Sequence, residues 1–227
     1  MQIRYLGHAA FSLTDGDTEV LVDPFLTGNP KAAVGADEPR PDAILLTHGH
    51  SDHYGDVVDI AKRTGATVVA ITEVAGELSG KLGEDHPVLN PNLGGTVELP
   101  WGSVRLVPAW HTSTTPDGTV STPAGLVIEL GGKRIYHVGD TALFSDLALP
   151  GKRGKIDVAL VPIGGHFTMD RFDAVVAAEL IGADQIIPCH YGTFPLIETD
   201  AQAFKADVEH AGYAQVVVLA PGESHTP

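Results

Sequence analysis

The chain has 227 residues, a length that single α/β domains commonly reach, and contains 29 acidic but only 14 basic residues. The resulting net charge of −15 argues against nucleic acid as a partner, because phosphate binding requires clustered Lys and Arg. No apolar run approaches the ~18 residues of a membrane span and the amino terminus does not resemble a secretion signal, so we expect no membrane partner.

Strand-like and helix-like segments alternate along the chain. Strands are predicted at residues 2–6, 9–13, 19–22, 43–46, 67–71, 103–107, 125–130, 134–138, 157–162, 185–189 and 215–219. Helices are predicted over 54–63, within 73–82, over 171–181 and over 201–211, the last with Thr199 and Gln202 in capping-box spacing. This order predicts mixed sheets with outer helices in a single domain over residues 1–227, with two loose halves joined at 87–95.

The single cysteine, Cys189, excludes an intramolecular disulfide and suits a reducing compartment, so a cytoplasmic location is expected. Cys189 ends a strand-like run, and the interpretation as a small buried core residue is favoured over a nucleophile. The densest basic segment, Lys152-Arg153-Gly154-Lys155, is interpreted as a solvated loop in preference to an anion clamp.

The most informative segment follows the apolar run 43–46 and contains His48, His50, Asp52 and His53. Neutral imidazole nitrogens and a carboxylate are the ligands that zinc-like ions prefer. The gaps between the histidines, two and three residues, do not match the four-residue gap of a helical zinc motif. We therefore predict a metal-binding turn at the end of a strand, followed by a helix.

Three further candidate ligands each end a strand-like run, namely His111, Asp140 and His190. Taken singly, a histidine at a strand end is more often a hydrogen-bonded structural residue than a ligand. Ligands nevertheless gather at the carboxyl ends of strands in α/β sheets, and together these residues would complete two coordination spheres.

With Asp23 after Val20-Leu21-Val22, these motifs resemble the five motifs of the metallo-β-lactamase superfamily. Residues 7–11, 22–25, 162–169 and 188–194 further resemble compact bacterial metal-dependent hydrolases of unknown substrate, allied to ascorbate-phosphate lactonase. The resemblance implies an α/β fold, an αββα sandwich of two mixed β-sheets flanked by helices, with the site along one edge.

The resemblance also implies a binuclear ligand set. One ion would be held by His48, His50 and His111, the second by Asp52, His53 and His190, with Asp140 as the bridge. Zinc is the first expectation, and manganese, iron or nickel would fit similar ligands. Asp23 would orient a ligand histidine through its other ring nitrogen, although an Asp-Pro turn explains it equally well.

The implied function is hydrolysis of a small-molecule ester, lactone or phosphoester by a metal-bridging hydroxide. Asp52 would carry a proton, and His166 or His8 would protonate the leaving group, a structural hydrogen bond being the alternative for each histidine. The rival interpretations are a small-molecule phosphodiesterase, a diiron redox enzyme and a non-catalytic metal-binding module. Asp140 stands where one group of true β-lactamases has cysteine, which argues against antibiotic hydrolysis. By analogy with related proteins, assembly into a homo-oligomer is an open alternative to a monomer.

Overall fold

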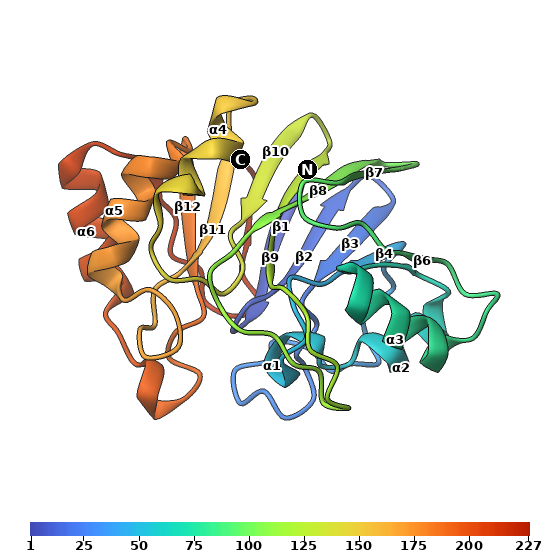
Figure 1. Ribbon diagram of the computed structural model, residues 1–227. Coiled ribbons are helices and arrows are strands. Elements are labelled where there is room, and N and C mark those ends of the chain that lie inside the picture. The colour runs from blue at the N-terminus through green and yellow to red at the C-terminus, as the bar shows by residue number, and fades with distance from the viewer.

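Two seven-stranded sheets pack face to face in the computed structural model, which describes residues 1–227 (Figure 1). The first sheet has the spatial order β14 (Ser224–His225), β1 (Gln2–Gly7), β2 (Ala10–Asp15), β3 (Thr18–Val22), β4 (Ala43–Leu45), β5 (Thr67–Val69) and β6 (Val88–Leu89). The second has the order β13 (Gln215–Val216), β12 (Gln185–Cys189), β11 (Val158–Pro162), β10 (Lys133–His137), β9 (Ala124–Leu130), β8 (Gly102–Pro108) and β7 (Thr96–Leu99). Both sheets mix parallel and antiparallel pairs.

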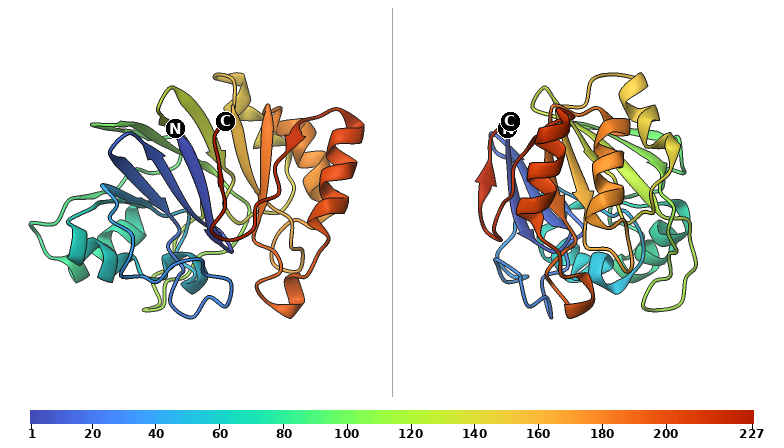
Figure 2. Two further views of the ribbon diagram at one scale, coloured as in Figure 1. Left: turned by 180° about the vertical axis from the view of Figure 1, so that it is seen from behind. Right: turned by 90° about the vertical axis from the view of Figure 1, so that its left-hand side faces the viewer.

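Helices cover the outer face of each sheet, as the two turned views show (Figure 2). The first sheet carries α2 (Val57–Thr64) and α3 (Thr72–Leu82), and the second carries α5 (Arg171–Ile181) and α6 (Ala201–Ala211). Shorter turns are α1 (Ser51–Tyr54), α4 (Leu149–Lys152), η1 (Ser145–Ala148) and η2 (Pro195–Ile197). The layers confirm the predicted αββα sandwich. None of these helices is both long and apolar enough to cross a membrane.

The alternation of side chains along each strand divides the core in two. In β11, Val158 and Leu160 belong to the cluster between the sheets, whereas Ala159 and Val161 belong to the cluster beneath α5 and α6. All four are fully buried. Such a strand therefore packs on both faces, and each fully buried Val or Leu contributes roughly 1.5–3 kcal/mol.

Cys189 lies in the cluster between the sheets and is 1% exposed. Burial raises the pKa of its thiol well above the usual value, and the Asp140 and Asp23 carboxylates add to the effect. A thiol that stays protonated in the core is a poor nucleophile, in line with the structural interpretation of this residue.

The structure corrects three details of the predicted elements. The predicted helix over 54–63 is divided at Gly55, which has a φ of 40° and whose missing Cβ would lie 2.3 Å from the carbonyl oxygen of Pro24. Helix α6 begins on Asp200 rather than in a capping box at Thr199, since the Asp200 carboxylate accepts from the Gln202 and Ala203 amides. Strands β6, β7 and β14 are edge strands that were not predicted, because two to four residues carry little periodic signal.

Candidate metal centre

The histidine-rich segment forms a loop between β4 and α1, as the sequence predicts. Leu46 and Thr47 continue β4 in a fully buried extension, and His50 precedes α1, where its carbonyl accepts from the amides of His53 and Tyr54. Gly49 allows this loop to lie close against the loop after His111. A Cβ at this position would lie only 2.8 Å from the Thr115 side chain. Strand, loop and helix thus place the side chains at the carboxyl end of β4.

Asp140 follows β10 and stands at the centre of the site. One of its carboxylate oxygens, Oδ2, lies 3.1 Å from Nε2 of His190 and 3.3 Å from Nε2 of His53. The same oxygen lies 3.6 Å from Nε2 of His111 and 4.0 Å from Nε2 of His48. Four imidazoles from three separate parts of the chain therefore face one carboxylate that is only 3% exposed.

The candidate ligands separate into two main groups around Asp140. Within each group the ligand atoms lie within 4.8 Å of one another. One group consists of His48, His50 and His111, and the other consists of Asp52, His53 and His190 together with His8. His48 Nε2 and His50 Nδ1 are 3.1 Å apart, close to the ~3.3 Å expected of two nitrogens on one tetrahedral ion with 2.0–2.1 Å bonds.

Asp23 fixes the orientation of two of these imidazoles. It is fully buried, and its Oδ2 lies 2.7 Å from His53 Nδ1 and accepts from the Thr47 hydroxyl at 2.6 Å. The Thr47 oxygen in turn lies 3.0 Å from His48 Nδ1. With both Nδ1 atoms occupied as donors, His48 and His53 present Nε2 to the centre of the site.

Three buried residues of the site adopt left-handed backbone. His8, Asp23 and His190 have φ values of 60°, 45° and 52°. A residue with a Cβ loses of the order of 1–3 kcal/mol in such a conformation, so the surrounding contacts must hold it there. One such contact joins the backbones of two of them, where the His190 amide donates to the His8 carbonyl at 2.7 Å.

The polar atoms at the centre fit a bound cation. His53 Nε2, His190 Nε2 and Asp140 Oδ1 are buried without a hydrogen-bond partner, a state that costs ~1–3 kcal/mol per group. Burial, with His53 nearby, lowers the pKa of His48 well below 6.5 and leaves a neutral ligand. Burial opposes ionisation of Asp140, yet His190 and His53 lower its pKa well below the usual range. Imidazole nitrogens and negative charge thus converge where a metal ion would sit.

His8 forms a hydrogen bond with the Asp52 carboxylate. It is fully buried, with Nε2 3.1 Å from Asp52 Oδ2 and Nδ1 2.9 Å from the Thr193 hydroxyl oxygen. Burial lowers its pKa to about 4 against the opposing effect of Asp52, so the ring is neutral at pH 7. Thr193 completes this contact. It lies in the 188–194 segment noted in the sequence, but the sequence did not identify it as a site residue.

His166 is exposed and belongs to neither ligand group. Its ring packs edge-on against that of Phe167, with centroids 4.4 Å apart. The backbone of this segment is tied to the site, because the Met169 amide donates to the Thr141 carbonyl at 3.0 Å. Phe167, not His166, is the residue of the segment that lines the cavity described next.

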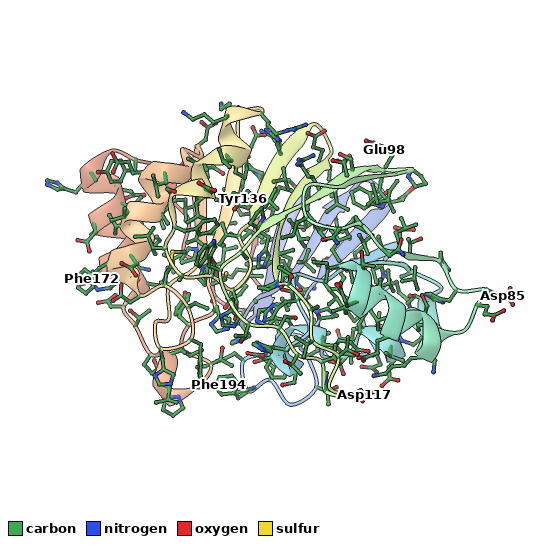
Figure 3. The ribbon with its side chains drawn as sticks, in the orientation of Figure 1. Asp85, Glu98, Asp117, Tyr136, Phe172 and Phe194 are labelled. Atoms are coloured by element: carbon green, nitrogen blue, oxygen red, sulfur yellow. The ribbon has the colours of Figure 1, made fainter.

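The ligands open into a cavity of about 510 Å³. Its polar side is formed by His50, Ser51, Asp52, His111, Thr112, Asp140 and His190. Its apolar side is formed by Phe25, Phe167, Phe194 and Leu196, which sequence reasoning did not identify as site residues. In Figure 3 the labelled Phe194 lies at the lower edge of the molecule, the edge that carries α1.

Two contacts anchor the loop that follows His111. The Gly49 amide donates to the Ser113 hydroxyl at 3.0 Å, and the Thr115 hydroxyl donates to the Glu77 carboxylate of α3. Glu77 was not singled out in the sequence, because its hydrogen-bond partners Tyr54 and Thr115 are distant along the chain. The cavity wall after His111 is thereby held by the helix layer of the first sheet.

The fold and the cluster of histidine and aspartate side chains around Asp140 define the class of the protein. It is a metal-dependent hydrolase of the metallo-β-lactamase fold. The β-lactamase superfamily domain model matches residues 2–190. A UPF0173 metal-dependent hydrolase of Thermus thermophilus is 49% identical over 224 residues, 98% of this chain and 97% of the relative. Another from Methanopyrus kandleri is 48% identical over 230 residues, 99% of each chain. The chain belongs to the UPF0173 metal-dependent hydrolases.

Solved structures agree with this assignment. A metallo hydrolase from the hyperthermophilic archaeon Ignicoccus hospitalis is 36% identical with a TM-score of 0.89, covering 99% of this chain and 97% of that one. The metallo-β-lactamase fold protein YhfI from Bacillus subtilis is 16% identical with a TM-score of 0.73, over 99% and 98% of the two chains. At that identity the second likeness concerns the fold alone.

Proposed function

We propose that the chain binds two divalent ions, zinc first among them, and hydrolyses a small uncharged ester or lactone that carries an apolar group. The position of Asp140 between two groups of candidate ligands supports the binding of two ions. Its Oδ2 faces His111 and His48 on one side and His53 and His190 on the other, at 3.1–4.0 Å. A carboxylate so placed is suited to bridge two ions.

Two divalent ions held by these residues would supply a water-derived nucleophile at neutral pH and would polarise the substrate oxygen. Asp52 is the residue positioned to take up the proton of that water, since its side chain is 29% exposed and lines the cavity. Burial raises the pKa of Asp52, but the nearby His190 imidazole, 3.8 Å away, and the hydrogen bond from His8 outweigh burial and keep the carboxyl ionised. Neutral His8 holds Oδ2 of Asp52 and leaves the second oxygen for proton transfer.

The cavity walls support an uncharged substrate. Phe25, Phe167, Phe194 and Leu196 offer apolar surface, and no Lys or Arg is among the lining residues. Apart from bound ions, the cavity has no cation that would hold a phosphate group. A small acyl or lactone ring can lie against the aromatic wall with its carbonyl toward Asp140. This favours an ester or lactone over a phosphodiester.

Metal content and turnover test the proposal together. Elemental mass spectrometry on untagged protein should find two ions per chain. The protein should hydrolyse 4-nitrophenyl butyrate and γ-butyrolactone in preference to bis(4-nitrophenyl) phosphate. Asp140→Ala should lower kcat/KM by more than about 100-fold, because it removes the bridge and not merely a supporting contact. Asp59→Asn, an exposed carboxyl change on α2, is the matched control and should leave both readouts unchanged.

The other outcomes are equally definite. Turnover confined to the phosphodiester would replace the proposal with the phosphodiesterase interpretation. One ion per chain with full activity would refute the binuclear site. Absence of both metal and metal-restored turnover would point to a non-catalytic binding module.

A further inference from the structure

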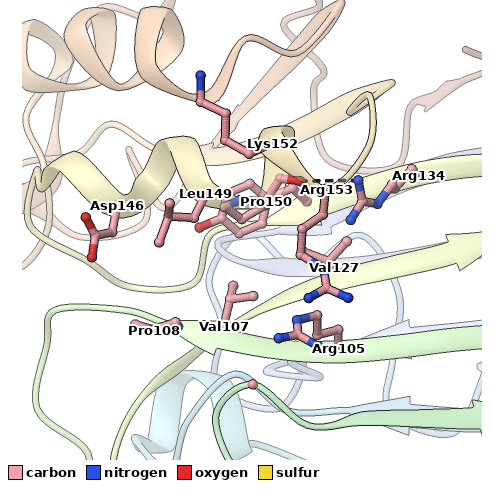
Figure 4. Close-up of a pocket in the computed structure, with 12 residues that line it drawn as sticks. Arg105, Val107, Pro108, Val127, Arg134, Asp146, Leu149, Pro150, Lys152 and Arg153 are labelled. Atoms are coloured by element: carbon pink, nitrogen blue, oxygen red, sulfur yellow. Dashed lines mark hydrogen bonds between the residues drawn. The ribbon is translucent and has the colours of Figure 1, made fainter.

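A second cavity lies on the outer face of the second sheet, beneath α4 (Figure 4). It has a volume of about 310 Å³ and shares no residue with the metal cavity. In Figure 3 the labelled Tyr136, which lines this second cavity, lies well above Phe194 of the metal cavity. The second cavity is therefore a separate feature that the proposed hydrolysis does not use.

Three guanidinium groups meet at one end of this cavity. They come from β8 (Arg105), β10 (Arg134) and the residue after α4 (Arg153). Figure 4 shows the Arg153 and Arg105 side chains directed toward one another. Arg134 is fixed in place because its Nη1 donates to the carbonyls of Pro150, at 3.2 Å, and Gly154.

This positive charge is scarcely balanced by protein carboxylates. Arg134 has one ion pair, 3.5 Å from the 59% exposed Glu129, whereas Arg105 and Arg153 have none. Burial and the proximity of Arg153 and Arg134 lower the pKa of Arg105. A chain with 29 acidic and 14 basic residues thus gathers like charges at one point, an arrangement that an anion would stabilise.

The rest of the cavity is largely apolar. Val107 and Val127 lie on the sheet side and Leu149 and Pro150 on the α4 side, with Leu149 54% exposed. The only carboxylate that lines the cavity, Asp146, lies at the end opposite the guanidinium groups in Figure 4. The cavity is thus polarised, with a cationic end and an apolar middle.

We propose that this cavity binds a small organic phosphate, a phosphate monoester with an apolar group. The phosphate lies between Arg105 and Arg153 with Arg134 behind them, because guanidinium forks match phosphate oxygens and a dianion neutralises two of the charges. The apolar group lies against Val127 and Leu149. A volume of about 310 Å³ is at the lower end of the range of small-molecule sites.

Three probes separate the parts of this proposal in titration calorimetry on the metal-loaded full chain. Hexyl phosphate carries both features, inorganic phosphate only the charge, and hexanol only the apolar group. Hexyl phosphate should bind at least ten-fold more tightly than either of the others. The double variant Arg105→Gln, Arg153→Gln should lose at least ten-fold in affinity, whereas Lys62→Gln, an exposed charge removal on α2, should bind as wild type does.

Folding and site assignment are checked with the same variants. Without ligand, the double variant should be no less stable to urea than wild type, because the two guanidinium groups that it lacks repel one another in wild type. Equal binding by wild type and the double variant would place hexyl phosphate at the metal cavity and overturn the proposal. Hexyl phosphate that binds no better than inorganic phosphate would also overturn it, since the apolar surface would then make no contribution.

Discussion

Glu77 connects α3 to the loop after His111, and we expect its ionisation to stabilise the fold measurably. Its side chain is 10% exposed, accepts from the Tyr54 hydroxyl at 3.1 Å and from the Thr115 hydroxyl, and pairs with Lys81 at 2.9 Å. Burial alone would raise the pKa of Glu77. The hydrogen bonds from Thr115 and the other partners outweigh burial and lower the pKa from 4.5 to about 2.

The size of the effect follows from this difference. A carboxyl whose pKa falls from 4.5 to about 2 on folding contributes about 3 kcal/mol at neutral pH. Because the folded-state pKa is the lower one, the contribution is complete above pH 4.5, falls to less than about half near pH 3 and disappears below pH 2. Glu77→Gln keeps the shape and some hydrogen bonds, so we expect a loss of ~1–3 kcal/mol at pH 7.

Urea unfolding of wild type and Glu77→Gln at pH 7, 4 and 3 measures this difference, since effects of other carboxyls cancel between the two proteins. Glu73→Gln, an exposed change on the same helix, is the control and should stay within ~0.5 kcal/mol of wild type. Lys81 also pairs with Asp117 at 2.8 Å, so it keeps one carboxylate in the variant. A penalty that is the same at every pH, or none at pH 7, would refute the electrostatic reasoning.

Three other expectations concern the metal centre and the core. Asp23→Asn should weaken metal affinity by about 10–100-fold in competition with a chromophoric chelator, because an amide offers one uncharged oxygen where the carboxylate accepts through two, from Thr47 and His53; unchanged affinity would contradict this. Removal of the metal should lower Tm, and readdition should restore it. At a free metal concentration of 100 times Kd, the bound metal contributes ~2.7 kcal/mol to the free energy of unfolding, and this is the expected loss. Cys189 should react with a thiol reagent only as fast as the chain unfolds, because burial keeps the thiol protonated; rapid labelling of the native protein would disprove its placement.

The sequence was sufficient for the parts of the fold and site whose signals are local. His48, His50 and His53 are neighbours in one turn, so the sequence alone predicts that they bind a metal ion. Helices α5 and α6 span the predicted residues because each has a clear periodic face and a terminal glycine, Gly182 or Gly212.

The contacts that complete the structure could not be predicted because they join distant residues. Thr193 meets His8 across 185 positions, and Thr115 meets Glu77 across 38. The basic segment after α4 looked like a solvated loop, and Arg153 is indeed exposed. Only the pairing of the strands brings it beside Arg105, and side-chain chemistry on one segment contains no information about that pairing.

The position of His8 favours one of the two roles that its sequence left open. A residue that protonates a leaving group must reach the substrate and carry a proton near neutral pH. His8 is fully buried, has both ring nitrogens engaged by Asp52 and Thr193, and has a pKa of about 4. It is also held in left-handed backbone, with a φ of 60°, by a turn that contacts His190. These properties suit a positioning residue, whose rigidity keeps the Asp52 carboxylate directed at the metal centre.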